Sequence, residues 1–177
     1  MGPASYLVTA ADLWPVNEGI SVIKFADDTY LIMSAVNSGT SAAELAHIED
    51  WLQKNNLRLN CTKTKEIIFR VKGKRGSTAE VPAPCEAIAR VTTLTMLGVV
   101  INEQMTAVDH VSSLFTTCSR LLYTLRVLRN HGIPAASMSD VFRATVIDKL
   151  MYCALAWAGF TSAADQARLD AFFCGFI

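Results

Sequence analysis

The chain has 177 residues, a length that suits about one domain and is enough to bury a hydrophobic core. Hydrophobic residues make up 51% and charged residues 18%, a composition that excludes an intrinsically disordered protein. The 16 lysines and arginines balance the 16 aspartates and glutamates, so any basic surface for nucleic acid must be local.

Cysteine usage and hydropathy indicate an intracellular protein. The five cysteines are scattered without a Cys-x-x-Cys pair, which argues against a zinc site and a disulfide framework. Reduced thiols fit the cytoplasm or the nucleus. The strongly apolar run 150–160 is too short to span a membrane and predicts a buried helix. We therefore expect no membrane partner.

Residues 22–33 hold two apolar, strand-like runs that flank an adjacent pair of carboxylates, Asp27 and Asp28. This pattern predicts a β-hairpin with the aspartates at or beside its turn. A divalent cation would relieve the repulsion between them, and Mg²⁺ prefers such hard oxygen ligands while leaving room for substrate phosphates. The alternative is an ordinary hairpin whose aspartates merely suit a turn.

A helix is predicted after the hairpin. Ser41 and Glu44 have the spacing of a capping box, apolar residues follow at helical intervals, and Asn55-Asn56 marks the stop. Within this helix, Trp51 is expected in the core.

Residues 57–69 predict a turn that leads into a strand. The next segment places Lys72, Lys74 and Arg75 among glycines, which predicts an exposed loop. Its cations could contact a phosphate backbone, or the loop could simply be solvated.

Two β-prone runs, 88–95 and 96–101, follow the basic loop. Gly98 lies inside the second run. A glycine there would permit close approach of another backbone, or it would mark a bulge.

From about Thr106 the apolar residues recur by threes and fours, which predicts amphipathic helices. Gly132 supplies a C-terminal stop and Pro134 suits the first turn of the next helix. Between residues 119 and 152 there are five basic residues, Arg126 and Arg129 among them, and two acidic ones. Such cations could bind phosphates or form a solvated helix face.

Four features occur in one order and together cover nearly the whole chain. They are Lys-Phe-Ala-Asp-Asp-Thr at 24–29, Leu-x-Leu-Asn-x-x-Lys-Thr at 57–64, Leu-Gly-Val at 97–99, and basic amphipathic helices beyond 104. In this order they resemble the reverse transcriptase of non-LTR (LINE-type, jockey- or CR1-like) retrotransposons. The resemblance implies an α+β fold, with a partial palm of antiparallel sheet and helices at 1–103 and an α-helical, thumb-like region at 104–177.

The resemblance also implies chemistry. Asp27 and Asp28 would bind Mg²⁺ or Mn²⁺ for two-metal nucleotidyl transfer, with the two ions about 4 Å apart. Lys63 would lie near the incoming triphosphate, where a lysine can protonate pyrophosphate, although a solvated lysine in a turn is equally consistent. Gly98 would belong to a primer-grip hairpin. The implied partners are an RNA template, a DNA primer and a dNTP.

One departure from the family limits the expected activity. The family's Gln-Gly-Ser helix and the strand with its first catalytic aspartate have no counterpart, and neither Asp12 nor Glu18 lies in a strand-like pattern. We expect the chain to start inside the polymerase domain and to be inactive alone, because a two-metal site needs both ligand sets. The alternatives are a non-catalytic module that binds nucleic acid or protein, and a functionless relic of the element.

Overall fold

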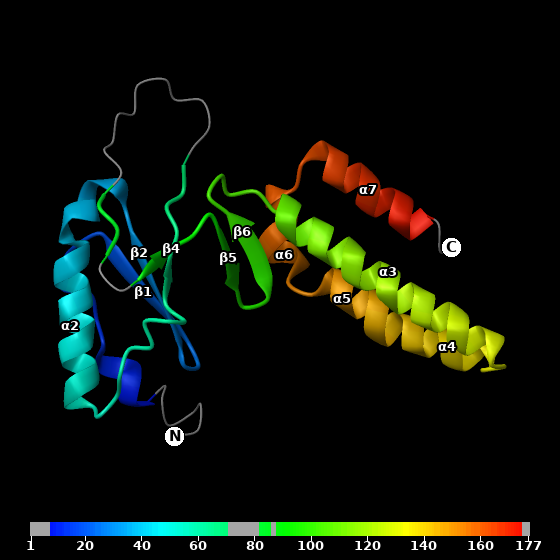
Figure 1. Ribbon diagram of the computed structural model, residues 1–177, viewed down its shortest axis with the longest axis horizontal. Coiled ribbons are helices and arrows are strands. Elements are labelled where there is room, and N and C mark those ends of the chain that lie inside the picture. The colour runs from blue at the N-terminus through cyan, green and yellow to red at the C-terminus, as the bar shows by residue number, and fades with distance from the viewer. Residues whose placement is uncertain (1–7, 71–81, 86–87, 175–177) are drawn as a thin grey trace. The chain divides into compact units, whose positions relative to one another are not determined.

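The computed structural model describes residues 8–70, 82–85 and 88–174, which form a mixed α+β structure (Figure 1). Two compact units divide the chain: the first holds residues up to 66 together with 82–90, and the second holds 67–70 together with 91 onward. The α+β expectation is confirmed. The units divide near residue 91 and not at the expected 103, because the strands at 93–102 pack with the helical part.

The predicted aspartate hairpin forms in the first unit. Strand β1 (Ile20–Phe25) pairs antiparallel with β2 (Asp28–Met33), in a register that runs from Ile20 opposite Met33 to Phe25 opposite Asp28. This register leaves a two-residue turn, Ala26 and Asp27.

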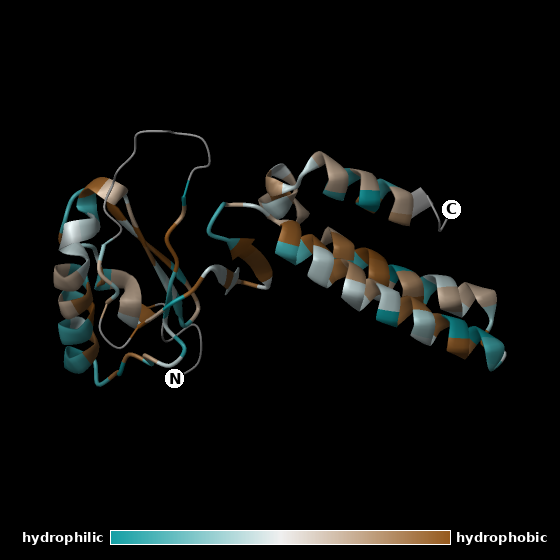
Figure 2. Ribbon diagram, turned by 45° about the horizontal axis from the view of Figure 1, so that its top comes forward, coloured by the Kyte–Doolittle hydropathy of each residue, from teal (hydrophilic) through white to brown (hydrophobic). Residues whose placement is uncertain are grey.

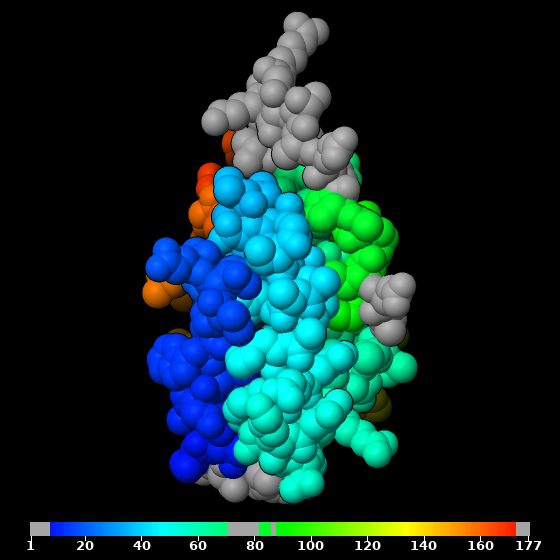
Figure 3. Space-filling view, turned by 90° about the vertical axis from the view of Figure 1, so that its left-hand side faces the viewer, coloured from blue at the N-terminus to red at the C-terminus, as the bar shows by residue number. Residues whose placement is uncertain are grey.

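Helix α2 (Ser41–Lys54) follows the 3₁₀ turn η2 (Ala35–Thr40) and packs over a small hydrophobic core. The space-filling view in Figure 3 shows the N-terminal segment (blue) lying along this helix (cyan). The core comprises Ala10, Leu13, Trp51 and Leu52, with Ile48, Leu57 and Leu59 against it. Trp51 is buried as expected, and its indole nitrogen donates a 2.9 Å hydrogen bond to Asp12 in η1 (Ala10–Asp12).

The predicted capping box is wrong. Thr40 is the N-cap residue, without a side-chain cap bond, and Ser41 already belongs to α2. The fully buried Glu44 carboxylate instead accepts hydrogen bonds from the Val16 amide (3.0 Å), the Asn17 amide (2.7 Å) and the Asn17 side chain (2.8 Å). Burial by itself raises the pKa of Glu44, but these bonds outweigh it and the net pKa is lowered.

Replacing Glu44 by Gln should lower the free energy of unfolding by about 2–3 kcal/mol at neutral pH, since the charge-assisted bonds to the segment before β1 are lost. Glu49→Gln, on the exposed side of the same helix, is the matched control. Because the folded-state pKa of Glu44 is lowered, its carboxylate contributes fully to the free energy of unfolding above its ordinary pKa of about 4.3. This contribution is lost as the pH falls through the folded-state pKa. Denaturant titrations should therefore show the difference between wild type and Glu44→Gln narrowing in acid; a difference independent of pH would contradict this account.

The remaining strands of the first unit are shorter than expected. β3 (Lys65–Glu66) pairs in parallel with β4 (Ala89–Arg90), and the Arg90 guanidinium donates a 2.7 Å hydrogen bond to Glu66. The strand expected to continue through residue 69 stops at Glu66, where the chain passes into the second unit. There the Arg70 amide bonds to the Glu103 carbonyl at 2.7 Å.

A second hairpin opens the other unit. β5 (Thr93–Met96) pairs antiparallel with β6 (Val99–Asn102) through the two-residue turn Leu97-Gly98. Gly98 is thus in a turn, not in a strand or a bulge, and both turn residues have positive φ, 47° and 82°, as in a type I′ turn. The Tyr152 hydroxyl donates a 3.0 Å hydrogen bond to the Leu97 carbonyl. A Cβ on Gly98 would lie 3.1 Å from the ring of Tyr152.

Gly98→Ala should therefore lower the free energy of unfolding by about 2–3 kcal/mol, from the positive φ and from displacement of the Tyr152 ring. Gly132→Ala separates the two causes. Gly132 also has a positive φ, 84°, but no atom lies within 4 Å of its added Cβ, so the expected loss is about 1 kcal/mol. Chemical denaturation of both variants measures the difference, and equal losses would show that Tyr152 does not confine the turn.

Long helices complete this unit. α3 (Val108–Asn130) lies beside a continuous helical segment made of α4 (Ala135–Phe142), a π-helical turn (Arg143–Ile147) and α5 (Asp148–Met151), as Figure 1 shows. The predicted stop at Gly132 is confirmed, whereas Pro134, expected in the first turn of the next helix, is the N-cap residue that precedes it. Figure 2 shows the hydrophobic character of the β5–β6 hairpin beside helices of mixed hydropathy. The buried core comprises Val99, Ala107, Val111, Leu114, Cys118, Leu125, Val146, Leu150 and Trp157.

The expected buried helix over 150–160 is wrong. The helix ends at Met151, Cys153 adopts a left-handed conformation (φ 50°), and two short pieces follow, α6 (Ala154–Trp157) and η4 (Ala158–Phe160). Leu155 is fully exposed, because only one side of this segment faces the core. Among the described residues, no helix combines the length and apolar character needed to cross a bilayer.

The last helix, α7 (Ala163–Cys174), begins with a capping box that was not predicted. The Asp165 amide donates to the Ser162 hydroxyl oxygen (3.1 Å), while the buried Asp165 carboxylate accepts from the Ser162 amide and hydroxyl. Phe172 packs edge-on against Phe115 of α3, at 5.5 Å between ring centres.

Candidate functional site

The two aspartates lie at the tip of the β1–β2 hairpin. Asp27 is the second residue of the turn and Asp28 is the first residue of β2, opposite Phe25. Both carboxylates are exposed. Successive side chains of a strand point to opposite faces, so the carboxylates of Asp27 and Asp28 leave the turn tip in different directions.

The hairpin turn contains an unusual backbone conformation. Ala26 has a φ of 52°, whereas Asp27 is not among the residues with positive φ. A two-residue turn with positive φ at its first position only matches type II′, in which glycine is the preferred first residue. An alanine there costs about 1–2 kcal/mol, and backbone outliers of this kind cluster at functional sites.

Replacing Ala26 by Gly should raise the free energy of unfolding by about 0.5–1 kcal/mol, because relief of the left-handed conformation exceeds the entropy that glycine adds to the unfolded chain. The control Ala46→Gly, on the exposed side of α2, should lower it by about 1 kcal/mol. Urea denaturation of the pair tests the strain, and a loss in Ala26→Gly as large as in Ala46→Gly would mean that the turn stores none.

Lys24 ties the hairpin to the N-terminal segment, a role that the sequence did not reveal. Its ammonium donates hydrogen bonds to the carbonyls of Ala10 and Leu13 (2.6 Å to Leu13) and lies 5.5 Å from the centre of the Trp14 ring. Burial lowers the pKa of Lys24, and the charge of Asp12 partly opposes the shift. The only sequence signal is a lysine on the inward-facing side of an alternating strand.

The opposite face of the hairpin is apolar and exposed. Ile23, Phe25 and Ile32 are 51%, 59% and 50% exposed, and Phe25 shares this face with its cross-strand partner Asp28. The carboxylates therefore border a hydrophobic surface, whereas the other face, which includes the buried Ile20, packs on its own unit.

Lys63 sits in a turn organised by Asn60. The Asn60 carbonyl accepts the amides of Lys63 (3.0 Å) and Thr64 (2.9 Å), and its side-chain oxygen accepts from the Thr62 hydroxyl at 2.7 Å. The Lys63 side chain is exposed. Within the described part of the chain, no hydrogen bond or ion pair joins it to Asp27 or Asp28.

Of the other predicted contact residues, Lys72, Lys74 and Arg75 lie outside the described residues. Arg126 and Arg129 are exposed on α3, in the second unit.

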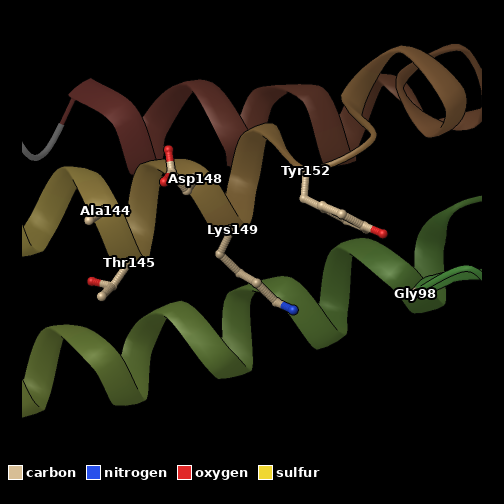
Figure 4. A pocket seen from close by; sticks show the side chains of 6 residues that line it. All are labelled: Gly98, Ala144, Thr145, Asp148, Lys149 and Tyr152. Carbon is tan, nitrogen blue, oxygen red and sulfur yellow. The ribbon is translucent and has the colours of Figure 1, made fainter.

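Gly98 lines a pocket of about 470 Å³ in the second unit, shown in Figure 4. Tyr152, just after α5, lies beside the Gly98 turn and Lys149 extends from α5 toward α3, whereas Asp148 points to the other side of that helix. The side of Gly98 on which a Cβ would project is filled by Tyr152. Neither Tyr152 nor Lys149 was predicted to line this pocket.

The buried His110 lies in the same unit. Its Nδ1 accepts a hydrogen bond from the Val100 amide (3.3 Å), and its ring meets Trp157 edge-on at 5.2 Å. Burial lowers the pKa of His110, and the positive charge of Lys149 lowers it further, which keeps the imidazole neutral.

The donor set at the hairpin tip suits a hard divalent cation. Mg²⁺ commonly binds through one or two carboxylates and completes its shell with water and substrate phosphates, a role open to Asp27 and Asp28. In the part of the chain that the structure describes, no group of three or more histidines, cysteines or carboxylates could hold a metal ion. Two carboxylates leave the rest of a Mg²⁺ coordination shell to water and substrate oxygens.

Comparison with protein-family models, with curated proteins and with solved structures finds no match to this chain. Its function is therefore inferred from its motifs and from the geometry of its hairpins.

Proposed function

We propose that this chain belongs to an RNA-directed DNA polymerase of the non-LTR retrotransposon type. In this proposal Asp27 and Asp28 contribute to the metal site for nucleotidyl transfer. The observation that carries the proposal is the tight two-residue turn, which holds both carboxylates exposed at a hairpin tip on a strained Ala26 backbone. The order of the four sequence motifs supports it.

The resemblance to the family gives the candidate residues their proposed roles. Asp27 and Asp28 bind Mg²⁺ or Mn²⁺, which stabilises the attacking and leaving oxygens of the transfer when bound. Lys63, exposed on its turn, donates a proton toward pyrophosphate. Gly98, Arg126, Arg129 and the basic segment with Lys72, Lys74 and Arg75 contact the nucleic acid, and the RNA template, DNA primer and dNTP are the partners.

The second candidate is a non-catalytic module that binds nucleic acid. The observation that favours it is the pair of exposed arginines on α3, Arg126 and Arg129, which form no ion pair among the described residues. Such a module would keep its salt-dependent affinity for nucleic acid in Asp27→Ala and Asp28→Ala.

Metal binding separates the two candidates. Addition of Mn²⁺ should broaden the backbone amide NMR signals around Ala26–Asp28 first, and the double change Asp27→Asn with Asp28→Asn should weaken the Kd for Mn²⁺ about tenfold or more. The control Asp50→Asn removes an exposed carboxylate that pairs with Lys54 on α2 and should leave the Kd unchanged. Equal Mn²⁺ affinity in wild type and the hairpin double variant would refute the polymerase assignment and favour the binding module.

A further inference from the structure

A large aromatic side chain projects into solvent from the C-terminal half of α3. Tyr123 is 69% exposed, although it lies within a 23-residue helix whose other side forms the core of its unit. Neither the fold nor the aspartate hairpin uses this ring. An exposed tyrosine on a rigid helix is a low-entropy contact element for a partner.

The surface around Tyr123 is polar and carries charge of one sign. At 3.6 residues per turn, the α3 residues from 112 to 130 that lie within about 60° of Tyr123 around the axis form one exposed strip. The strip comprises Ser112, Thr116, Ser119, Arg120, Tyr123, Arg126, Val127 and Asn130. It contains two arginines and no acidic residue. Asp109, at a similar angle in the first turn of α3, lies about 21 Å along the axis from Tyr123 and accepts a hydrogen bond from Asn102.

The two arginines flank the ring. Arg120 precedes Tyr123 by three residues and Arg126 follows it by three, which places them about 4.5 Å along the axis on either side of the ring. Ion pairs among the described residues engage other side chains, namely Lys54 with Asp50, Arg90 with Glu66, and Arg168 with Asp165. The acidic residue of α3 is Asp109, in its first turn. The guanidinium groups of Arg120 and Arg126 therefore remain available to an external anion.

We propose that this strip binds a single-stranded nucleic acid, with an unpaired base stacked on Tyr123 and phosphates bound by Arg120 and Arg126. Aromatic rings stack on bases whatever their identity, and arginine recognises phosphate oxygens with two parallel hydrogen bonds. Hydroxyl and amide groups such as Thr116 and Asn130 are further phosphate contacts.

The ring selects an unpaired strand over a duplex. In a duplex the bases stack on each other and leave no face for a tyrosine, whereas unpaired bases stack readily on aromatic side chains. The site refines the nucleic-acid contact proposed above for Arg126 by naming the ring and the unpaired strand, and it does not depend on metal binding at the hairpin. It also assigns Arg126 to an unpaired strand, while Arg129 lies outside the strip, about 120° around the axis from Tyr123.

Fluorescence anisotropy with a short labelled oligoadenylate RNA and the full chain tests the site, over a range of salt concentrations. Tyr123→Ser should weaken binding roughly 5- to 100-fold with an unchanged salt slope, and Tyr123→Phe should bind like wild type. Arg120→Gln and Arg126→Gln should each reduce the slope of log K against log salt by about 0.7. The exposed Arg58→Gln, in the other unit, is the control and should leave affinity unchanged. Circular dichroism checks that each variant is folded.

Three outcomes would overturn the proposal: binding that is indifferent to Tyr123→Ser, preference for a blunt RNA–DNA duplex of equal length, or salt slopes that Arg120→Gln and Arg126→Gln leave unchanged. The result is separable from that of the metal experiment. RNA binding through Tyr123 without metal at the hairpin refutes the polymerase assignment alone, whereas Mn²⁺ bound by Asp27 and Asp28 in a chain that ignores oligoadenylate refutes the strip alone.

Discussion

Buried polar ties hold the aspartate hairpin in its unit. The Glu44 carboxylate, at zero exposure, collects the amides of Val16 and Asn17 just before β1, and Lys24 in β1 bonds to the carbonyls of Ala10 and Leu13. Burying a charge without partners is very costly, so these groups are tolerated only in this one arrangement. Apolar packing is not directional, whereas the hydrogen bonds of these charged groups are. The charged groups therefore fix the position of the hairpin within its unit.

Both hairpins close through two-residue turns that contain a non-glycine residue at positive φ, Ala26 in one and Leu97 in the other. Each such residue stores strain that the surrounding structure must hold. At Leu97 the restraint is visible, since the Tyr152 hydroxyl binds its carbonyl and the Tyr152 ring covers Gly98. At Ala26 the pairing of β1 with β2 closes the turn, and Asp27 and Asp28 are exposed at its tip.

Part of the candidate site could be predicted, because its signals are local. The aspartates were placed at a turn by the apolar runs on both sides, which need only alternation and a turn pair. Lys24, Tyr123 and Tyr152 were not predicted. The local sequence around a lysine does not reveal that its ammonium bonds to carbonyls of a distant segment. Nor does the local sequence around a tyrosine reveal that its ring lies outside the packed core.

Two pairs of residues with one spacing show where sequence alone stops. Ser41 and Glu44 have the spacing of a capping box, but Glu44 accepts hydrogen bonds from amides 27 and 28 residues away. Ser162 and Asp165, with the same spacing, do form a capping box. Local sequence signals were enough to predict the hairpin at 22–33, the stop of α2 at Asn55-Asn56 and the helices on either side of Gly132, since turn residues and periodicity act within a few positions. Tertiary structure decided the partner of Glu44, the break at Cys153 in an apolar run and the exposure of Tyr123. These depend on which donors and surfaces other segments bring into contact, and short-range patterns carry no record of that.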